Sequence, residues 1–275
     1  MRAVVYSATV YDAGVLVAAA LGQVGGPGVL PGGCPGPYSD AMPAAGPVAR
    51  VPVTSVDEAI ARMEAIGASV PAEDGLGCFN RMYLEVTKQV EGRLGTGFFA
   101  DTAFMTQLDV TFANLYFTAV DAAGNPPAVP LAWRPLIEQR AQRGIEPIQF
   151  ALAGMNAHIN HDLPLAVTGT CTALATSPSA GAHQADYQKV DQLLDAAEQS
   201  VRQSFESAPE LAVDRHLQAV NNLIASWSIN SARDLAWTNS LLLWEVRADP
   251  LARGLLCDSL AAATAAASRM LLVAV

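Results

Sequence analysis

Apolar residues recur at helical spacing from near residue 55 almost to the C-terminus. This spacing restricts the fold of the chain more than any other feature. Gly- and Pro-rich breaks interrupt the spacing, as at residues 125–133 and 176–182, and these indicate loops. In one stretch five apolar side chains recur at helical intervals: Phe79, Met82, Tyr83, Val86 and Val90. Because no strand-like alternation follows residue 50, we predict an all-α fold of about eight helices.

The first fifty residues differ from the rest of the chain. They are rich in Gly and Pro, which break both helices and strands, so we expect residues 1–50 to form an irregular N-terminal arm. Residues 51–275 then form a single helical domain. Only 15% of the residues are charged, against about 25% on average, and 51% are hydrophobic. This composition favours closely packed helices that bury most of their faces.

The charge of the chain argues against nucleic acid and membrane surfaces as partners. The formal net charge is −10 and no basic run occurs, whereas both kinds of partner attract clustered Lys and Arg. The first residues weakly resemble a signal peptide, but Asp12 interrupts the apolar run. We therefore expect a cytoplasmic protein that makes no membrane contact, and a homodimer stays open as one oligomeric state.

Several common cofactor and nucleophile motifs are missing from the sequence. The four cysteines are widely spaced and form no CxxC pair, which argues against a zinc finger. Phosphate-binding, dinucleotide-binding and nucleophile-elbow motifs are not found either. We therefore expect no cofactor, with a divalent metal ion as the alternative.

The segment GMNAHINHDLP, residues 154–164, places polar groups in an apolar helix. His158 and Asp162 are four residues apart, so their side chains can touch on one helix face. A carboxylate beside an imidazole fixes its tautomer and raises its basicity, as a general base requires. Small residues such as Gly154 leave space beside this face, while Pro164 is expected to kink or end the helix. The alternative is a buried polar network that only fixes helix packing.

Asn156 and Asn160 lie on the roughly opposite face of the same helix. They could donate hydrogen bonds to an oxyanion or to neighbouring helices. The packing role is the one that the sequence favours, although Asn156 is kept among the candidate catalytic residues.

A second polar group is found at His183 and Asp186, at the entry to another helix. Capping and favourable interaction with the helix dipole explain acids in a first turn. Alternatively, these residues meet the first cluster across a helix bundle and bind a metal ion. The ligand set of that alternative is His158, His161, Asp162 and His183.

A lone carboxylate, Asp109, lies in a strongly apolar segment and should be either paired or protonated. Arg233 is the partner that we expect, in a structural ion pair. The aromatic residues of the helical segments either belong to the core or line a pocket for an apolar ligand. The candidate substrate-binding side chains are Phe112, Tyr116, Tyr83, Tyr187 and Trp237.

Several segments occur in an order that resembles a bacterial, mainly actinobacterial, family of domains of unknown function. They include LDVTFANLYF, GMNAHINHDLP and ARDLAWTNSLLLW, and the resemblance covers roughly residues 52–250. The Gly- and Pro-rich first fifty residues depart from the family pattern. The resemblance implies a single helical domain with GMNAHINHDLP as its core motif, and it carries no established activity.

Three hypotheses for the function follow. The first is an acid–base enzyme without a redox cofactor that acts on a hydrophobic small molecule, such as a polyketide or terpenoid intermediate, by cyclisation, elimination or hydrolysis. His158 is then the acid or base and Asp162 orients it, with Asn156, His183 and Asp186 as further candidates. The second is a metal-dependent hydrolase that uses His158 and Asp162 with His183 and Asp186. The third is a non-catalytic small-molecule-binding or scaffold protein.

Overall fold

The computed structural model describes residues 51–206 and 228–274, with the backbone alone for 195–206. These residues form helices and loops without any strand, which confirms the predicted all-α class. The irregular arm expected at 1–50 lies outside the described residues, and so does the segment HLQAVNNLIASW, residues 216–227, whose apolar residues predict a further helix. No helix within the described ranges is long and apolar enough to cross a membrane.

The described helices number eight when the continuous run from α6 to α7 is counted as one, in agreement with the sequence pattern. They are α2 (Val56–Ser69), α3 (Gly75–Glu91), α4 (Thr102–Ala122), α5 (Arg134–Gln139), α6 (Pro147–Ala157), the π-helical turn η3 (His158–Asp162), α7 (Leu163–Ala173), α8 (His183–Glu206), α10 (Ile229–Glu245) and α11 (Pro250–Leu271).

Short polar side chains fix where several helices begin. Asp74 accepts hydrogen bonds from the backbone N–H groups at the start of α3, and Asp101 does the same for α4. Asp249 caps α11 in the same way. Such caps satisfy backbone donors that have no partner within the helix, and each stabilises a helix by about 1 kcal/mol.

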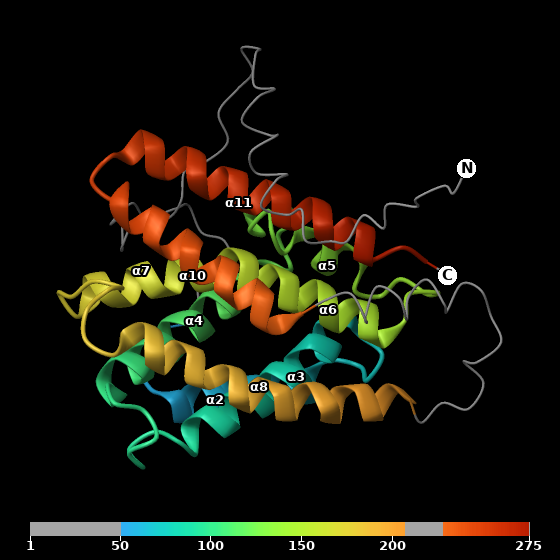
Figure 1. Ribbon diagram of the computed structural model, residues 1–275. Helices are drawn as coiled ribbons and strands as arrows, with labels where there is room; N and C mark the ends of the chain where they lie inside the picture. Colours follow the sequence, from blue (N-terminus) through green and yellow to red (C-terminus); the bar gives the residue numbers. More distant parts are fainter. Residues whose placement is uncertain (1–50, 207–227, 275) are drawn as a thin grey trace, which may run out of the picture.

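The run α6–η3–α7 lies in the middle of the molecule (Figure 1). Helices α10 and α11 pack on one side of it, and α3 and α4 pack on the other, with α2 against α3 and α4, and α8 against α3, α4 and α10. Nearly every residue of α6 is buried, which explains why its sequence is apolar all round. Side chains that project from the central run therefore reach the interior on both sides.

Of the two outcomes expected at Pro164, a kink or an end of the helix, the end does not occur. Ahead of it, the N–H of Leu163 bonds to the carbonyl of His158, five residues back, as in a π-helix. In a regular α-helix a proline ring meets the carbonyl four residues earlier. The wider turn at η3 gives the ring room, so the helix passes the proline and continues as α7.

Two buried amides on α6 hold α11 against it. Gln149 donates to the carbonyls of Leu271 and Val273, at 2.7 and 3.0 Å. Asn156 donates to the carbonyl of Thr264 and to the hydroxyl of Ser268, both at 2.9 Å. The polar groups on this side of the central helix are thus engaged in helix packing.

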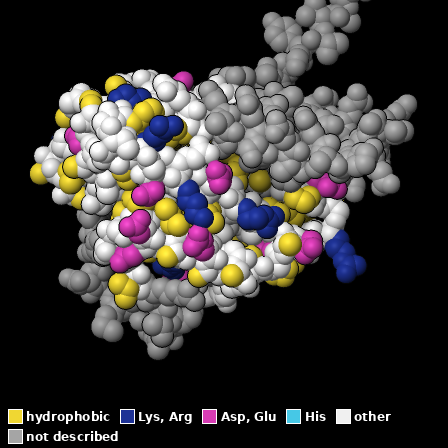
Figure 2. All heavy atoms as spheres, turned by 90° about the horizontal axis from the view of Figure 1, so that it is seen from below, with side chains coloured by type: hydrophobic (Ala, Val, Ile, Leu, Met, Phe, Trp, Pro, Cys, Tyr) yellow, Lys and Arg dark blue, Asp and Glu magenta, His cyan; other side chains and the backbone are white. Residues whose placement is uncertain are grey.

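The surface seen from below mixes charges of both signs (Figure 2). Lys and Arg side chains are interspersed there with Asp and Glu, and they do not gather into a basic patch on the coloured part of this face. This described part of the surface therefore offers no concentrated positive charge for an anionic partner.

Candidate functional site

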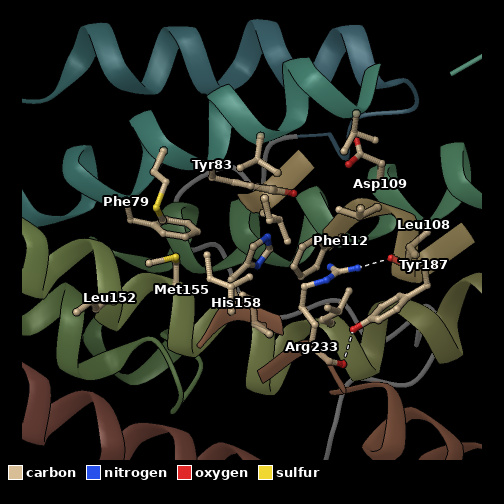
Figure 3. A pocket seen from close by; sticks show the side chains of 18 of the residues that line it. Phe79, Tyr83, Leu108, Asp109, Phe112, Leu152, Met155, His158, Tyr187 and Arg233 are labelled. Atoms are coloured by element: carbon tan, nitrogen blue, oxygen red, sulfur yellow. Dashed lines mark hydrogen bonds between the residues drawn. The ribbon is translucent and has the colours of Figure 1, made fainter. Parts of the chain in front are cut away.

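A cavity of about 110 Å³ lies where α3, α4, α8 and α10 meet the central helix (Figure 3). Its walls are mostly aliphatic and aromatic side chains. An apolar cavity of roughly 150 Å³ can hold benzene, so this one suits a part of a molecule about one small ring in size. The polar or titratable residues that line it are Tyr83, Asp109, His158, Tyr187 and Arg233.

The carboxylate of Asp162 is buried and accepts three hydrogen bonds. Its Oδ2 lies 3.0 Å from Nδ1 of His158 and 2.8 Å from Nε1 of Trp133. Its Oδ1 lies 2.7 Å from Nδ1 of His161. Burial alone raises the pKa of Asp162, but the hydrogen bonds and charges of the two histidines outweigh burial and hold the pKa below its usual value. Asp162 is therefore an anion that is fixed in place by its donors.

This arrangement sets the tautomer of His158. A carboxylate only accepts hydrogen bonds, so the proton of His158 lies on Nδ1 and points at Asp162. Burial lowers the pKa of His158 below its usual value, and the hydrogen bond and charge of Asp162 only partly oppose this. At neutral pH the imidazole is thus uncharged, and Nε2 carries a free lone pair.

Nε2 of His158 is buried and has no hydrogen-bond partner. The ring of Phe112 stacks on the imidazole with 3.5 Å between centroids, and the ring of Tyr83 meets it edge-on at 4.4 Å. Such contacts hold the ring in one orientation. His158 is therefore a neutral base that lines the cavity and has one unpartnered nitrogen.

Asp109 also lines the cavity, and its Oδ2 is buried without a hydrogen-bond partner. Burial raises the pKa of this carboxyl group to about 7. The alternative that the sequence left open, a protonated acid, is thus the one that this pKa supports up to neutral pH.

The ion pair expected between Asp109 and Arg233 is wrong. Nε of Arg233 lies 2.5 Å from Oδ1 of Asp191, and its NH2 group donates to the carbonyl of Tyr187 at 2.6 Å. In return, the hydroxyl of Tyr187 donates to the carbonyl of Arg233 at 2.7 Å. The guanidinium is drawn toward α8 because two acceptors there satisfy it.

Tyr83 brings a third unpartnered polar atom to the cavity, since its buried hydroxyl has no hydrogen-bond partner. Burial, followed by the charge of Asp109, raises the pKa of Tyr83 well above its ordinary value. The hydroxyl therefore keeps its proton and can donate it in a hydrogen bond.

His183 and Asp186 form a separate cluster at the start of α8, and they do not meet His158. His183 lies 2.9 Å from the carbonyl of Ser177 through Nδ1 and 3.2 Å from Asp101 through Nε2. The carboxylate of Asp186 accepts from two backbone N–H groups at the start of α4 and from Lys189. Both side chains are satisfied, so they serve a structural role, but the N–H partners of Asp186 lie just ahead of α4 and not in the first turn of α8 as the capping alternative expected.

The proposed metal ligands are not gathered into one site. His183 belongs to the cluster on α8, whereas His158, His161 and Asp162 belong to η3. Among the residues that the structure describes, no group of three or more His, Cys, Asp or Glu side chains is arranged to hold a metal ion.

Of the candidate aromatic residues, Phe112, Tyr83 and Tyr187 line the cavity. Tyr116 and Trp237 are buried beside it: the hydroxyl of Tyr116 donates to Asn80, and Trp237 packs on Tyr187. They pack against residues that line the cavity: Tyr116 contacts Tyr83, and Trp237 contacts Tyr187.

The space expected beside Gly154 is filled. A Cβ atom at Gly154 would lie only 2.4 Å from the ring of Phe79, so this glycine admits Phe79 to the face of α6. Asn156 likewise does not reach the cavity, because its amide faces α11.

Two contributors were missed by sequence reasoning. Trp133 orients Asp162, and Asp109 supplies a second titratable group to the cavity. Trp133 gives no signal in sequence, since it lies in a loop far from the motif. The signal for Asp109 was present, as a carboxylate in an apolar helix, but its partner was assigned wrongly.

Comparison with known proteins identifies a family, but the family has no assigned function. No curated protein and no solved structure matched the chain. A family profile matches residues 56–274, which include every residue of the site described above. The chain belongs to this family, DUF5995, a family of unknown function.

Proposed function

We propose that the protein is an acid–base enzyme for a small, hydrophobic molecule, with His158 as the group that accepts the proton. One observation carries the proposal: Nε2 of His158 is buried, unpartnered and part of an apolar cavity wall, while Nδ1 is held by Asp162. A histidine that served packing alone would have both nitrogens satisfied, as His183 does.

Asp162 acts as a positioning residue in this proposal. It fixes the tautomer of His158 and stabilises the imidazolium that forms when Nε2 takes a proton. Trp133 and His161 in turn hold the carboxylate, so its direction does not depend on the substrate. Such a dyad contributes proton transfer, which typically accelerates a reaction by roughly 10²–10⁴-fold.

The walls of the cavity limit the substrate and the reaction. The lining favours an uncharged molecule, or the uncharged part of a larger one such as a polyketide or terpenoid intermediate. Few polar groups are present to hold a hydrolytic water, which needs two to four partners. Cyclisation, elimination or isomerisation is therefore favoured over hydrolysis.

Exchange of carbon-bound hydrogen in D₂O tests the proposal without knowledge of the natural substrate. The probes are cyclohexanone and cyclohex-2-enone, which match the cavity in size and carry acidic C–H groups. We expect the wild-type protein to accelerate deuterium uptake above the buffer rate, as measured by NMR. His158→Gln should reduce this acceleration by on the order of 10²-fold.

His183→Gln is the matched control, because His183 is also buried but lies outside the cavity. Its exchange rate should equal that of the wild type, provided that circular dichroism shows a folded protein. Equal exchange rates for the wild type and His158→Gln would refute the proposal. Binding of the ketones without exchange would instead support the third hypothesis, a non-catalytic binding protein.

A further inference from the structure

We infer that Asp109 is a second functional residue of the cavity, which donates a hydrogen bond to an oxygen atom of the ligand while His158 faces the carbon skeleton. The inference rests on the proposed function and adds the substrate class: an uncharged, ring-sized molecule that carries a carbonyl group.

The position of Asp109 on α4 relates it to His158. Asp109 precedes Phe112 by three residues, so the two side chains leave the same face of the helix. Phe112 stacks on His158. Asp109 lies about one helical turn before Phe112, on the side of the cavity where Leu108 and the hydroxyl of Tyr83 are found (Figure 3). A ligand about one ring long therefore has a base near one end and a carboxyl group near the other.

The groups around Asp109 leave it without a cation. The titratable groups of the wall that face the cavity with it are Tyr83 from α3, His158 from η3, Tyr187 from α8 and Arg233 from α10. Arg233 is engaged by Asp191 and the carbonyl of Tyr187, and the tyrosines are neutral. Nothing here stabilises a carboxylate, and burial raises the pKa of Asp109 to about 7.

A protonated carboxyl group with a buried, unpartnered oxygen needs a hydrogen-bond partner, because leaving such a group unsatisfied is unfavourable. A ligand carbonyl would accept its proton, and the hydroxyl of Tyr83 could donate to the same oxygen. An anionic ligand would be disfavoured, since no free cation among the described residues faces this end of the cavity. These features favour a ketone or aldehyde over a carboxylic acid.

The two residues together define a balanced proton-transfer step. Nε2 of His158 takes a proton from the carbon next to the carbonyl, and the C–H electron pair forms a carbon–carbon double bond. The π electrons of the carbonyl take the proton of Asp109, which gives a neutral enol. If the ligand also carries a carbon–carbon double bond between its β and γ carbons, this enol is a dienol: His158 then returns its proton to the γ carbon, the enol oxygen returns its proton to Asp109, and the product is the α,β-unsaturated isomer. No redox partner is needed.

Binding of two isosteric probes tests the inference separately from catalysis. Cyclohexanone and methylenecyclohexane have the same shape, but only the ketone accepts a hydrogen bond. Dissociation constants would be measured by NMR titration at pH 6.5 for the wild type, Asp109→Leu, Asp109→Asn and His183→Gln. We expect the wild type to prefer the ketone, and Asp109→Leu to lose about tenfold of that preference.

The other two variants complete the design. Asp109→Asn retains a donor and should keep the preference, and His183→Gln, which changes a buried residue outside the cavity, should keep it as well. Between pH 6.5 and 8.5 the wild type should bind the ketone more weakly as Asp109 ionises, whereas Asp109→Asn should not. His158 is not the cause over this range, because burial lowers its pKa below 6.5.

An unchanged preference in Asp109→Leu would overturn the inference, and so would a wild type without preference. Failure of the proposed function looks different: the ketone preference would follow Asp109, yet the exchange rate would not depend on His158. The two readouts therefore fail independently.

Discussion

The behaviour of a buried polar side chain in this protein depends on how many of its atoms have partners. His158 and His183 are both buried and both stack on a phenylalanine ring. His183 has partners for both nitrogens, and His158 has a partner for one. The same residue type thus has a structural role on α8 and leaves one nitrogen available as a base on η3.

Asp109 should make the stability of the protein depend on pH in a recognisable way. The carboxyl group has a pKa of about 7 in the folded protein and close to 3.8 in the unfolded chain. As pH rises from about 4 to 7, the unfolded chain loses this proton and the folded protein keeps it, so the folded state loses stability. Asp109→Asn removes this loss and should be more stable at pH 8 by about 1–3 kcal/mol, which is less than the full pKa difference implies because Asp109 as a whole is only half-buried.

Chemical denaturation of both proteins at several pH values measures this difference. The gain of Asp109→Asn should be small near pH 3.5, should grow up to pH 7 and should then stay constant. Other carboxylates titrate alike in the two proteins and cancel. Parallel stability curves over the whole range would show that Asp109 is ionised in the folded state.

The imidazole of His158 offers a second measurement at this scale. Burial lowers its pKa, and Asp162 acts in the opposite direction. Its Cε1–H resonance should therefore titrate below pH 6.5, and Asp162→Asn should move the midpoint lower still. The resonance is assigned by its loss in His158→Gln. A midpoint that rises in Asp162→Asn would mean that Asp162 does not bear a charge beside the ring.

Among the elements, the central helix shows what sequence patterns can and cannot give. Its apolar character and the contact between His158 and Asp162 follow from spacing, and both are found. The π-helical turn does not follow from spacing, because a wheel of constant pitch cannot contain an extra residue. That turn lets the helix continue past Pro164, so His161 also reaches Asp162.

Gly154 is predicted to be the most demanding position on this helix. Gly154→Ala places a Cβ atom 2.4 Å from the ring of Phe79 and should destabilise the protein by about 1–3 kcal/mol. The second substitution Phe79→Leu should restore part of the loss. Gly169→Ala on α7 is the control: its Cβ would meet Thr111 at an ordinary 3.5 Å, so it should stabilise the helix by up to about 1 kcal/mol. Equal effects at the two glycines, measured by thermal unfolding, would contradict the close contact.

At the scale of the whole molecule, the cavity depends on how five helical segments meet. Helical periodicity places Phe112, Tyr83 and Asp109 on inward faces, but it carries no information on which inward faces adjoin. The pairing of Arg233 with Asp191 illustrates this, because the partner lies on α8 and α4 was expected. Separate placement of the His183 cluster has the same origin. Helical spacing therefore does not determine which helix faces adjoin in this fold.

The central helix joins two halves of the molecule, and its two faces should respond differently to mutation. Asn156→Ala removes the hydrogen bonds to Thr264 and Ser268 and should cost about 1–3 kcal/mol of stability. Because Asn156 faces α11, hydrogen exchange should accelerate in α11, while ketone binding and deuterium exchange in the cavity stay at wild-type values.

Asn80→Ala is the matched control. Asn80 is also buried, bonds to Met63 and Tyr116 and serves the opposite half, so its effect should appear in α2 and α3. If Asn156→Ala abolished ketone turnover in a stably folded protein, Asn156 would belong to the catalytic site after all, and the division of the helix into a packing face and a chemical face would be wrong.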